Sequence, residues 1–331
     1  MKKLLAILLA VALAFTLAAC GGSGSSSSAD PGSSPAEGGD GKPADFPKST
    51  ITFICPWDAG GSSDAMTRVV AELGNQYFGV NCVVQNSGGA GGTVATTEFK
   101  TTAADGYTIC MEAIGVFTLQ PFTREVGYSI DDFIPVTALT NEPIIMVAGK
   151  DTGIKSVEDL LKATDITYGF SGSGSLMELS QKLFFEEAGL EATGISYDGA
   201  SPTIAALLGG HIDIAAGHPA EVMQYIENGD VYPIGIFGGE RDTRDGIKDI
   251  PTFKEQGYDI EMSVWKFMIV PKDTPAEIVD YLTTTLDQIT SDPKFTEFCA
   301  NNNLLPIKMT ADEMLERIAA EAEVNKALLG K

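Results

Sequence analysis

The residues best suited to chemistry in this sequence lie in glycine- and serine-rich turns. The first turn lies within Cys55–Arg68 (CPWDAGGSSDAMTR) and joins a β-rich run to an amphipathic helical pattern. A helix that begins after a Gly-Gly-Ser-Ser turn presents unpaired backbone N–H groups, and such a terminus attracts anions. Ser62 or Ser63 could cap this helix. An ordinary turn without a ligand has the same features, and no Gly-Lys-Ser/Thr follows to make a Walker-type phosphate loop.

Three further turns share this character: Asn86–Gly92 (NSGGAGG), Ser171–Ser175 (SGSGS) and Tyr197–Ser201 (YDGAS). Each follows a predicted strand and precedes a helix, and ligands of open α/β sheets bind at that carboxyl edge. Two of the four turns come from each half of the fold, as a cleft between two lobes requires. Because the turns carry few charges, backbone N–H groups and hydroxyls would hold a carboxylate without an arginine. Together they predict a shared anion site.

The candidate ligand-binding residues come from these turns and from one histidine at a later strand end. Asp64 could be structural, or it could receive a ligand ammonium or hydroxyl, and Asp58 is a second candidate of this kind. Trp57 could stack on a planar ligand or only wall off the cleft. The predicted ligand-binding residues are Trp57, Ala59, Gly60, Gly61, Ser62, Ser63, Asp64, Asn86, Gly89, Ala90, Gly91, Ser171, Gly172, Ser173, Gly174, Ser175, Tyr197, Gly199, Ala200 and His218.

The same turns offer little for catalysis. Their serines lack the G-x-S-x-G elbow of a hydrolase. We expect His211 to be a solvated turn residue and His218 to be a hydrogen-bond donor at the edge of the cleft. We therefore expect no catalytic residue and no cofactor.

The cysteines do not form a metal site. Four of them follow Cys20, no pair has metal-ligand spacing, and neither histidine has a cysteine neighbour, so we expect no metal. Buried free thiols are the preferred interpretation, although an exported chain leaves one disulfide possible. The four are Cys55, Cys82, Cys110 and Cys299.

Alternating strand and helix signals position the turns. Such alternation predicts an α/β fold of mainly parallel sheets with helices on both faces. Capping boxes at Thr274 and Thr310 mark the last long helices, and Ser156 and Ser201 are predicted caps of shorter ones. Strands are predicted at Thr50–Ile54, Asn81–Gln85, Tyr107–Met111, Ile144–Ala148, Ile166–Phe170, Gly194–Tyr197, Ile212–Ala215, Pro233–Phe237 and Val264–Val270.

The N-terminus predicts export and a lipid anchor. Residues 1–19 carry two lysines and then a short apolar run, which is typical of a secretory signal peptide. Leu17-Ala18-Ala19-Cys20 resembles a lipobox, with cleavage before Cys20 and lipid attachment to its thiol. Residues 20–47 are rich in Gly, Ser, Pro and Asp and are predicted to form a disordered tether. The folded part would therefore lie outside the membrane, joined to its lipid anchor by a flexible tether.

Charge restricts the partners of the folded part. The chain has 22 basic and 45 acidic residues and a net charge of −23. Loss of Lys2 and Lys3 with the signal peptide makes the net charge about −25. Such a charge argues against nucleic acid and against electrostatic adhesion to anionic lipid. It does not exclude an anionic ligand, because local N–H dipoles can oppose the global field.

Several motifs carry a resemblance to one family. They run in order from about Thr50 to the C-terminus, and the sequence resembles the Bug family of extracytoplasmic solute-binding proteins of tripartite tricarboxylate transporters. Two departures put any particular ligand in doubt: Ser87-Gly88 replaces a usual Arg-Pro, and Met177 stands where a histidine is common. The motifs are PWDAGGSSDAMTR, QNSGGAGG, DGYT (Asp105–Thr108), YDGASPTIAALLGGHIDIA (Tyr197–Ala215) and SVWKFMIVPKDTP (Ser263–Pro275).

The resemblance implies a two-lobed periplasmic-binding-protein fold with an interlobe cleft. Lobe 1 would comprise residues 48–146 and 263–331, and lobe 2 would comprise residues 147–262. A small organic carboxylate would be captured in the cleft and delivered to membrane permease subunits, and we expect a monomer. One alternative is a ligand-sensing module for a signalling partner, without transport. An exported hydrolase that uses a cleft serine is a further, less favoured alternative.

Overall fold

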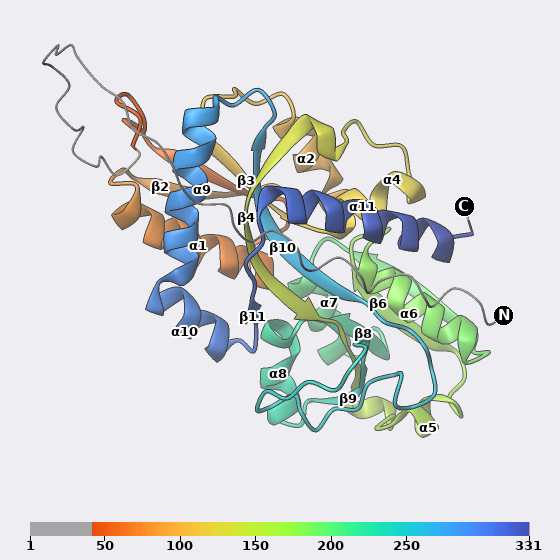
Figure 1. Ribbon diagram of the computed structural model, residues 1–331. Helices are drawn as coiled ribbons and strands as arrows, with labels where there is room; N and C mark the ends of the chain where they lie inside the picture. The colour runs from red at the N-terminus through yellow and green to blue at the C-terminus, as the bar shows by residue number, and fades with distance from the viewer. Residues whose placement is uncertain (1–41, 331) are drawn as a thin grey trace, which may run out of the picture. The chain divides into compact units, whose positions relative to one another are not determined.

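The computed structural model describes residues 42–330. The predicted signal peptide, the predicted lipidation site at Cys20 and most of the predicted tether lie outside the described residues. The described chain has an α/β fold built on two mixed sheets, as Figure 1 shows. No helix between residues 42 and 330 is both long and apolar enough to span a membrane.

The first sheet has six strands in the order β11-β4-β10-β3-β1-β2, and it defines lobe 1 with the helices that pack on it. β2 and β3 flank β1 and run parallel to it, whereas β10 runs antiparallel to β3 and β4. β11 also runs antiparallel to β4. The strands are β1 (Ile51–Cys55), β2 (Cys82–Asn86), β3 (Thr108–Ala113), β4 (Phe133–Pro143), β10 (Ser263–Pro271) and β11 (Leu305–Pro306).

The second sheet has five strands in the order β7-β6-β8-β5-β9, and it defines lobe 2 in the same way. Here β7 and β8 flank β6 and run parallel to it, and β5 runs antiparallel to β8 and β9. The strands are β5 (Ile145–Gly149), β6 (Ile166–Ser171), β7 (Ala192–Tyr197), β8 (Ile214–Gly217) and β9 (Val231–Ile236).

The helices alternate with these strands along most of the chain. Short 3₁₀ turns occur at η1 (Ala90–Gly92), η2 (Ile130–Asp132) and η3 (Lys150–Thr152). The α-helices are α1 (Ser62–Tyr77), α2 (Thr93–Phe99), α3 (Gly115–Thr118), α4 (Gln120–Thr123), α5 (Val157–Leu160), α6 (Leu176–Glu187), α7 (Ala200–Leu208), α8 (Pro219–Glu227), α9 (Ala276–Ser291), α10 (Pro293–Asn301) and α11 (Ala311–Leu328).

Two long strands connect the lobes. β4 and β10 pair from Ser263 opposite Pro143 to Pro271 opposite Phe133, and both extend from lobe 1 toward lobe 2 (Figure 1). The chain enters the second sheet at Ile145 and returns to the first at Ser263. The predicted lobe boundaries, after residues 146 and 262, lie beside these two changes of sheet.

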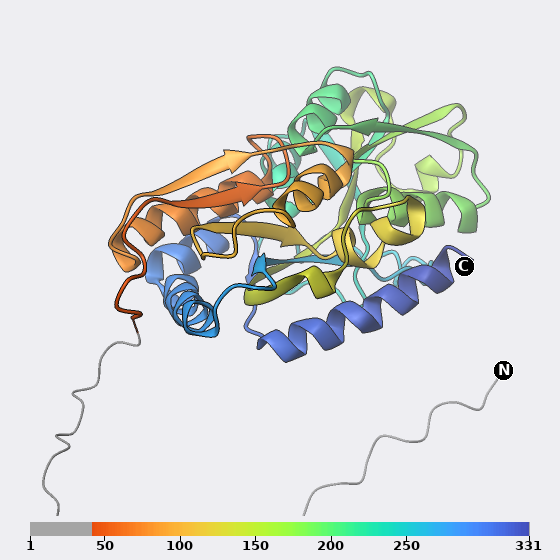
Figure 2. The same ribbon diagram turned by 90° about the horizontal axis from the view of Figure 1, so that it is seen from above.

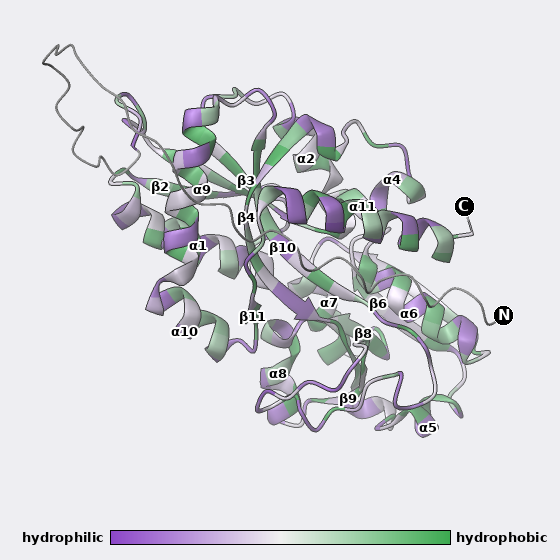
Figure 3. Cartoon of the chain, in the orientation of Figure 1, coloured by the Kyte–Doolittle hydropathy of each residue, from purple (hydrophilic) through white to green (hydrophobic). Residues whose placement is uncertain are grey.

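Apolar side chains fill three clusters around the two sheets. One face of the lobe 1 sheet packs on α1, α9 and α10, and α7 and α8 cover one face of the lobe 2 sheet. The remaining faces of both sheets share one continuous core, which includes Phe267 on β10 and Phe170 on β6. α11 closes this core along β4 and α3 (Figure 2), and its Asn325 Nδ2 donates to Thr118 Oγ1 at 3.1 Å. The central strands are accordingly mostly hydrophobic (green) in Figure 3, whereas the end of β4, which carries Asn141 and Glu142, is hydrophilic (purple).

Some local sequence predictions are confirmed and others are wrong. Ser156 and Thr310 cap α5 and α11 as expected. Ser201 lies inside α7, whose N-cap is Gly199, and the Thr274 hydroxyl donates to Pro271 O instead of capping α9. The strand β4 was not predicted.

Candidate functional site

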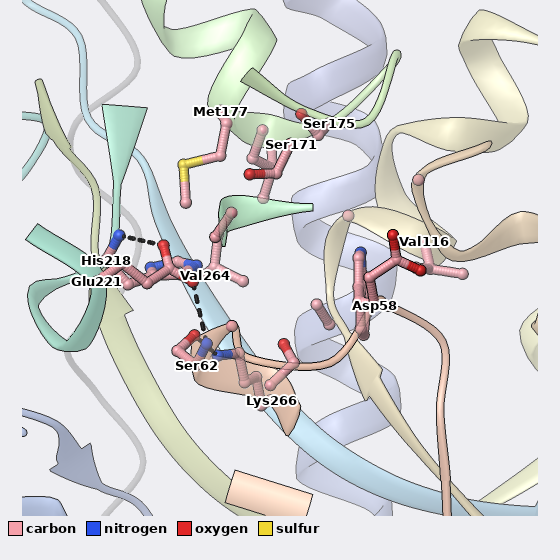
Figure 4. A pocket seen from close by; sticks show the side chains of 18 of the residues that line it. Asp58, Ser62, Val116, Ser171, Ser175, Met177, His218, Glu221, Val264 and Lys266 are labelled. Carbon is pink, nitrogen blue, oxygen red and sulfur yellow. Dashed lines mark hydrogen bonds between the residues drawn. The ribbon is translucent and has the colours of Figure 1, made fainter. Parts of the chain in front are cut away.

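A cavity lies where the carboxyl ends of β1 and β6 face each other across the two lobes. The cavity has a volume of about 80 Å³, which is enough for a small ligand of several non-hydrogen atoms. Ser171 and Ser175 lie on one side of it and Ser62 and Lys266 on the opposite side in Figure 4. The lining residues are Trp57, Asp58, Gly61, Ser62, Ser63, Gly91, Ala113, Gly115, Val116, Gln120, Ser171, Ser175, Leu176, Met177, Ala200, His218, Glu221, Val264 and Lys266.

Sheet topology explains why the cavity forms at this place. In lobe 1 the chain leaves β1 for β2 on one side and reaches β3 on the other, and in lobe 2 the strands β7 and β8 flank β6 in the same way. The connections from such a central strand diverge to opposite sides and leave a crevice at its carboxyl end, which is the topological switch point. Each lobe therefore supplies one crevice.

The N-terminus of α1 forms one wall of the cavity. Its N-cap is Gly61 and no side chain caps the helix, so the cap predicted at Ser62 or Ser63 is wrong. The Gly60 N–H donates to Asp64 Oδ2 at 2.9 Å, and the Ser62 N–H donates to Glu221 Oε1 of lobe 2 at 3.1 Å. The Ser63 N–H has no acceptor within residues 42–330. Carboxylates of the protein itself therefore accept two of the N–H groups at this helix terminus.

The N-terminus of α6 forms the opposite wall. Ser175 is its N-cap, and the Ser175 hydroxyl accepts from the Glu178 N–H at 3.2 Å. The N–H groups of Leu176 and Met177 find no acceptor in the described part of the chain, and both residues line the cavity. The first turn of α6 therefore offers two backbone donors and the positive end of the helix dipole to a ligand.

A buried ion pair lies at the bottom of the cavity. Lys266 Nζ is 2.8 Å from each carboxylate oxygen of Glu142, and it also donates to Ser62 Oγ at 2.6 Å. Lys266 is 1 % exposed and Glu142 is 0 % exposed. Burial alone would raise the pKa of Glu142, but the charges of Lys266 and His218 and the hydrogen bonds to the carboxylate outweigh it and lower that pKa. These partners therefore favour the charged form of the Glu142 carboxylate.

His218 extends this cluster toward lobe 2. Its Nδ1 lies 3.4 Å from Glu142 Oε2 and 3.3 Å from Pro143 O. The His218 backbone N–H donates to Glu221 Oε2 at 2.9 Å. Glu221 thereby joins the starts of α8 and α1 through the two oxygens of one carboxylate.

The two lobes also meet beside the cavity. Ser173 O, in the β6–α6 turn, accepts from Gln120 Nε2 at 3.0 Å and from Arg124 Nη2 at 2.6 Å. Close by, the backbones of Gly172 and Gly91 approach so closely that a Cβ on Gly172 would lie 2.7 Å from the Gly91 Cα. Glycine at both positions is what allows this contact between the lobes.

We expect Gly172→Ala to weaken binding of any ligand that the lobes enclose by about tenfold or more, because the added methyl group holds the turns apart. Gly189→Ala is the matched control: both glycines have positive φ, +87° and +67°, but a Cβ at Gly189 meets nothing within 4 Å. Titration calorimetry with a carboxylate bound by the wild type measures the effect. Equal affinity in the two variants would contradict this role.

Some of the predicted ligand-binding residues line the cavity and others do not. Those that line the cavity are Trp57, Gly61, Ser62, Ser63, Gly91, Ser171, Ser175, Ala200 and His218. Those that do not line it are Ala59, Gly60, Asp64, Asn86, Gly89, Ala90, Gly172, Ser173, Gly174, Tyr197 and Gly199.

Asp64 and Asn86 support the first turn from behind the cavity. Asp64 is buried and forms an ion pair with Arg68 at 2.9 Å. Asn86 Nδ2 donates to Asp64 Oδ1 at 2.9 Å and to Trp57 O at 3.1 Å. The Asp64 carboxylate is thus bound by other residues of the protein, which agrees with a structural role for Asp64 and not with ligand binding.

Of the charged residues in and below the cavity, sequence reasoning named Asp58 but missed Lys266, Glu142 and Glu221. Lys266 and Glu142 lie on β10 and β4, and Glu221 lies in the first turn of α8. The available signal was a lone lysine within an otherwise apolar run, VWKFMIV, because a charge inside a buried strand must have a partner. Gln120 and Val116 had no signal of this kind.

The remaining candidates for chemistry are inert or exposed. Cys55, Cys82, Cys110 and Cys299 are buried and unpaired, which confirms the preferred interpretation. Burial raises the pKa of Cys55 and Cys82 to about 11 and that of Cys299 to about 12. His211 is exposed in a bend. Residues 42–330 contain no group of three or more His, Cys, Asp or Glu side chains that could hold a metal.

Two α/β lobes joined by crossing strands, with a cavity at both switch points, define the class of periplasmic binding proteins. Residues 66–331 match the model of the tripartite tricarboxylate transporter family receptor. A UPF0065 protein from the TAR-I ttuE-ttuC' intergenic region of Agrobacterium vitis is 31% identical over 288 residues, which cover 84% of this chain and 83% of that protein. The chain therefore belongs to this receptor family, and the resemblance to the Bug family is confirmed.

Solved structures agree with this assignment. The periplasmic binding protein BugD superposes with a TM-score of 0.80 and 26% identity, over 86% of this chain and 98% of that one. R. palustris Rpa4515, solved with adipate, has the same TM-score and identity over 86% of this chain and 97% of that one. Both support the two-lobed fold, and the family places the protein on the extracytoplasmic side of the membrane.

Proposed function

We propose that this protein captures a small organic carboxylate between its lobes and delivers it to the permease subunits of a tripartite tricarboxylate transporter. The observation that carries the proposal is the cavity itself. It faces the N-terminus of a helix from each lobe, and the Ser63, Leu176 and Met177 amides have no acceptor in the described chain. Such amides bind a carboxylate without a cationic partner.

The chemistry of the lining supports a receptor and not an enzyme. The Ser62 hydroxyl accepts from Lys266 and donates to Glu142, so the buried ion pair holds this hydroxyl in place. A ligand in the cavity would contact both lobes at once and so favour the closed arrangement. The solved relative that holds adipate, a dicarboxylate, supports the same ligand class.

Titration calorimetry with a panel of ligands tests the proposal. The panel contains dicarboxylates, tricarboxylates, aromatic carboxylates and acidic amino acids, with neutral sugars and inorganic cations for comparison. We expect saturable binding of at least one carboxylate with a stoichiometry of one. Absence of binding by every carboxylate, together with binding of a sugar or cation, would overturn the proposal. Uptake of the bound carboxylate by membranes that contain the permease subunits then tests the delivery step.

We further propose that lipid on Cys20 tethers the receptor to the outer face of the membrane. The proposal rests on the LAAC sequence and on the Gly/Ser-rich segment that follows it. We expect the wild-type protein to incorporate labelled fatty acid and to sediment with membranes, and Cys20→Ser to do neither. Sedimentation of the Cys20→Ser protein with membranes would argue against lipid as the anchor.

A further inference from the structure

The first turn of α6 presents two backbone donors to the cavity. The Leu176 and Met177 N–H groups have no acceptor in residues 42–330, and the Ser171 and Ser175 hydroxyls lie beside them (Figure 4). On the α1 side, the Gly61 and Ser63 amides are lining donors without an acceptor in residues 42–330, and Glu221 Oε1 already accepts from the Ser62 amide between them. One ligand carboxylate can be held fully by the α6 turn.

The cationic side chain in the cavity is not available for a second carboxylate. The three N–H groups of Lys266 are matched by three acceptors, the two oxygens of Glu142 and Ser62 Oγ. An ammonium group has no further donor to offer. The charge of Lys266 is likewise balanced by Glu142, so this buried pair adds no net positive charge.

The Glu221 carboxylate bridges the starts of two helices beside the cavity. Its Oε1 accepts from the Ser62 N–H at the start of α1, and its Oε2 accepts from the His218 N–H at the start of α8. A side-chain carboxylate that bridges two helix N-termini makes the contacts that a ligand anion would make there. Because Glu221 lines the cavity, its negative charge faces the ligand (Figure 4).

His218 adds an acceptor on the same side. The residue is 6 % exposed, and its Nδ1 faces two acceptors, Pro143 O and Glu142 Oε2, so the tautomer with its proton on Nδ1 is the one that fits this site when the ring is uncharged. Nε2 is then a hydrogen-bond acceptor, and no residue of the described chain donates to it. The side of the cavity formed by α8 therefore requires donors from the ligand.

We propose that Glu221 is the residue that determines specificity, because it replaces a second ligand carboxylate. The ligand is then a monocarboxylate whose other end carries a hydrogen-bond donor, an ammonium or a hydroxyl group. Its carboxylate meets the α6 turn and its donor meets Glu221 and His218 Nε2. A dicarboxylate would place a negative charge beside Glu221, with the Asp58 carboxylate also on the lining. The inference rests on the proposed function and narrows its ligand class.

A series of ligands with one chain length tests this. Succinate, 4-hydroxybutyrate and 4-aminobutyrate share a four-carbon chain and one carboxylate, and they differ only in the group at the other end. Their affinities for the wild type, Glu221→Gln and the control Glu227→Gln are measured by titration calorimetry at about pH 8, where histidine is ordinarily neutral. Glu227 is exposed at the end of the same helix, so its variant has the same net charge change away from the cavity.

We expect the wild type and Glu227→Gln to bind a donor-ended member about 10- to 100-fold more tightly than succinate, and Glu221→Gln to lose or reverse this preference. Equal or tighter binding of succinate by the wild type overturns the inference, as does an unchanged preference in Glu221→Gln. If the series does not bind but another dicarboxylate or a tricarboxylate does, the inference fails and the proposed function stands. If no carboxylate of any kind binds, both fail.

Discussion

Lys266→Met is expected to lower the free energy of unfolding by about 3–5 kcal/mol, because it leaves a buried carboxylate without its cationic partner. Glu142 is fully buried on β4, and its remaining partners are Thr140, Ser62 and His218. Hydrogen bonds from two hydroxyls do not replace the opposite charge beside a fully buried carboxylate. Chemical denaturation monitored by circular dichroism measures the loss.

A second substitution distinguishes charge from packing in this result. Adding Glu142→Gln to Lys266→Met removes the stranded charge, so the double variant should recover most of the lost stability. Lys254→Met is the control for loss of a lysine charge, since Lys254 is exposed and its ion-pair distances are 3.7 and 3.8 Å. We expect it to change stability by less than about 0.5 kcal/mol. A double variant no more stable than Lys266→Met would show that lost packing and not charge is responsible.

Glu112→Gln is expected to stabilise the protein at alkaline pH and to change little at acidic pH. Glu112 lies on β3 and is fully buried, with Oε1 accepting from Thr96 Oγ1 at 2.8 Å and Oε2 without a partner in the described chain. Burial raises its pKa from 4.5 to about 8, and the bonds from Thr96 and Cys110 oppose this only in part. The native protein therefore holds a proton at neutral pH that the unfolded chain releases.

The sign of the pH dependence follows from this proton. The stability contribution of Glu112 is fully present below pH 4.5 and is lost as the pH rises toward about 8. Relative to Glu112→Gln, the wild type should lose about 3–5 kcal/mol of stability between about pH 5 and pH 9. Urea titrations of both proteins across this range measure the difference, with the exposed Glu98→Gln on α2 as control. A difference between wild type and Glu112→Gln that does not change with pH would contradict the assignment.

The features that could be predicted from the sequence are those that depend on residues close together along the chain. The turns after β1 and β6 were located from glycines and serines, and the Thr310 capping box from a spacing of three residues. The strand β4 was not predicted because it is buried on both faces and its sequence lacks alternation, and it also contains Pro135 and Asn141. An edge or turn is the usual setting for such residues.

The charged groups of the cavity depend on pairings that no local pattern records. Ser62 was predicted as a cap or a ligand donor, but its hydroxyl binds Lys266, 204 positions further along the chain. Lys266 and Glu142 are 124 positions apart and meet only because β10 and β4 are neighbours in the sheet. Glu221 could be placed in the first turn of a helix, but its bond to the Ser62 amide required the relative position of two lobes.

The core shared by the two sheets has a consequence for how the molecule comes apart. Phe267 of β10 and Phe170 of β6 belong to one uninterrupted apolar cluster, together with Met314 of α11. Neither lobe can unfold without exposing the core of the other lobe to water, because each lobe supplies part of the same packed cluster. Heat or denaturant should therefore unfold both lobes in a single cooperative step.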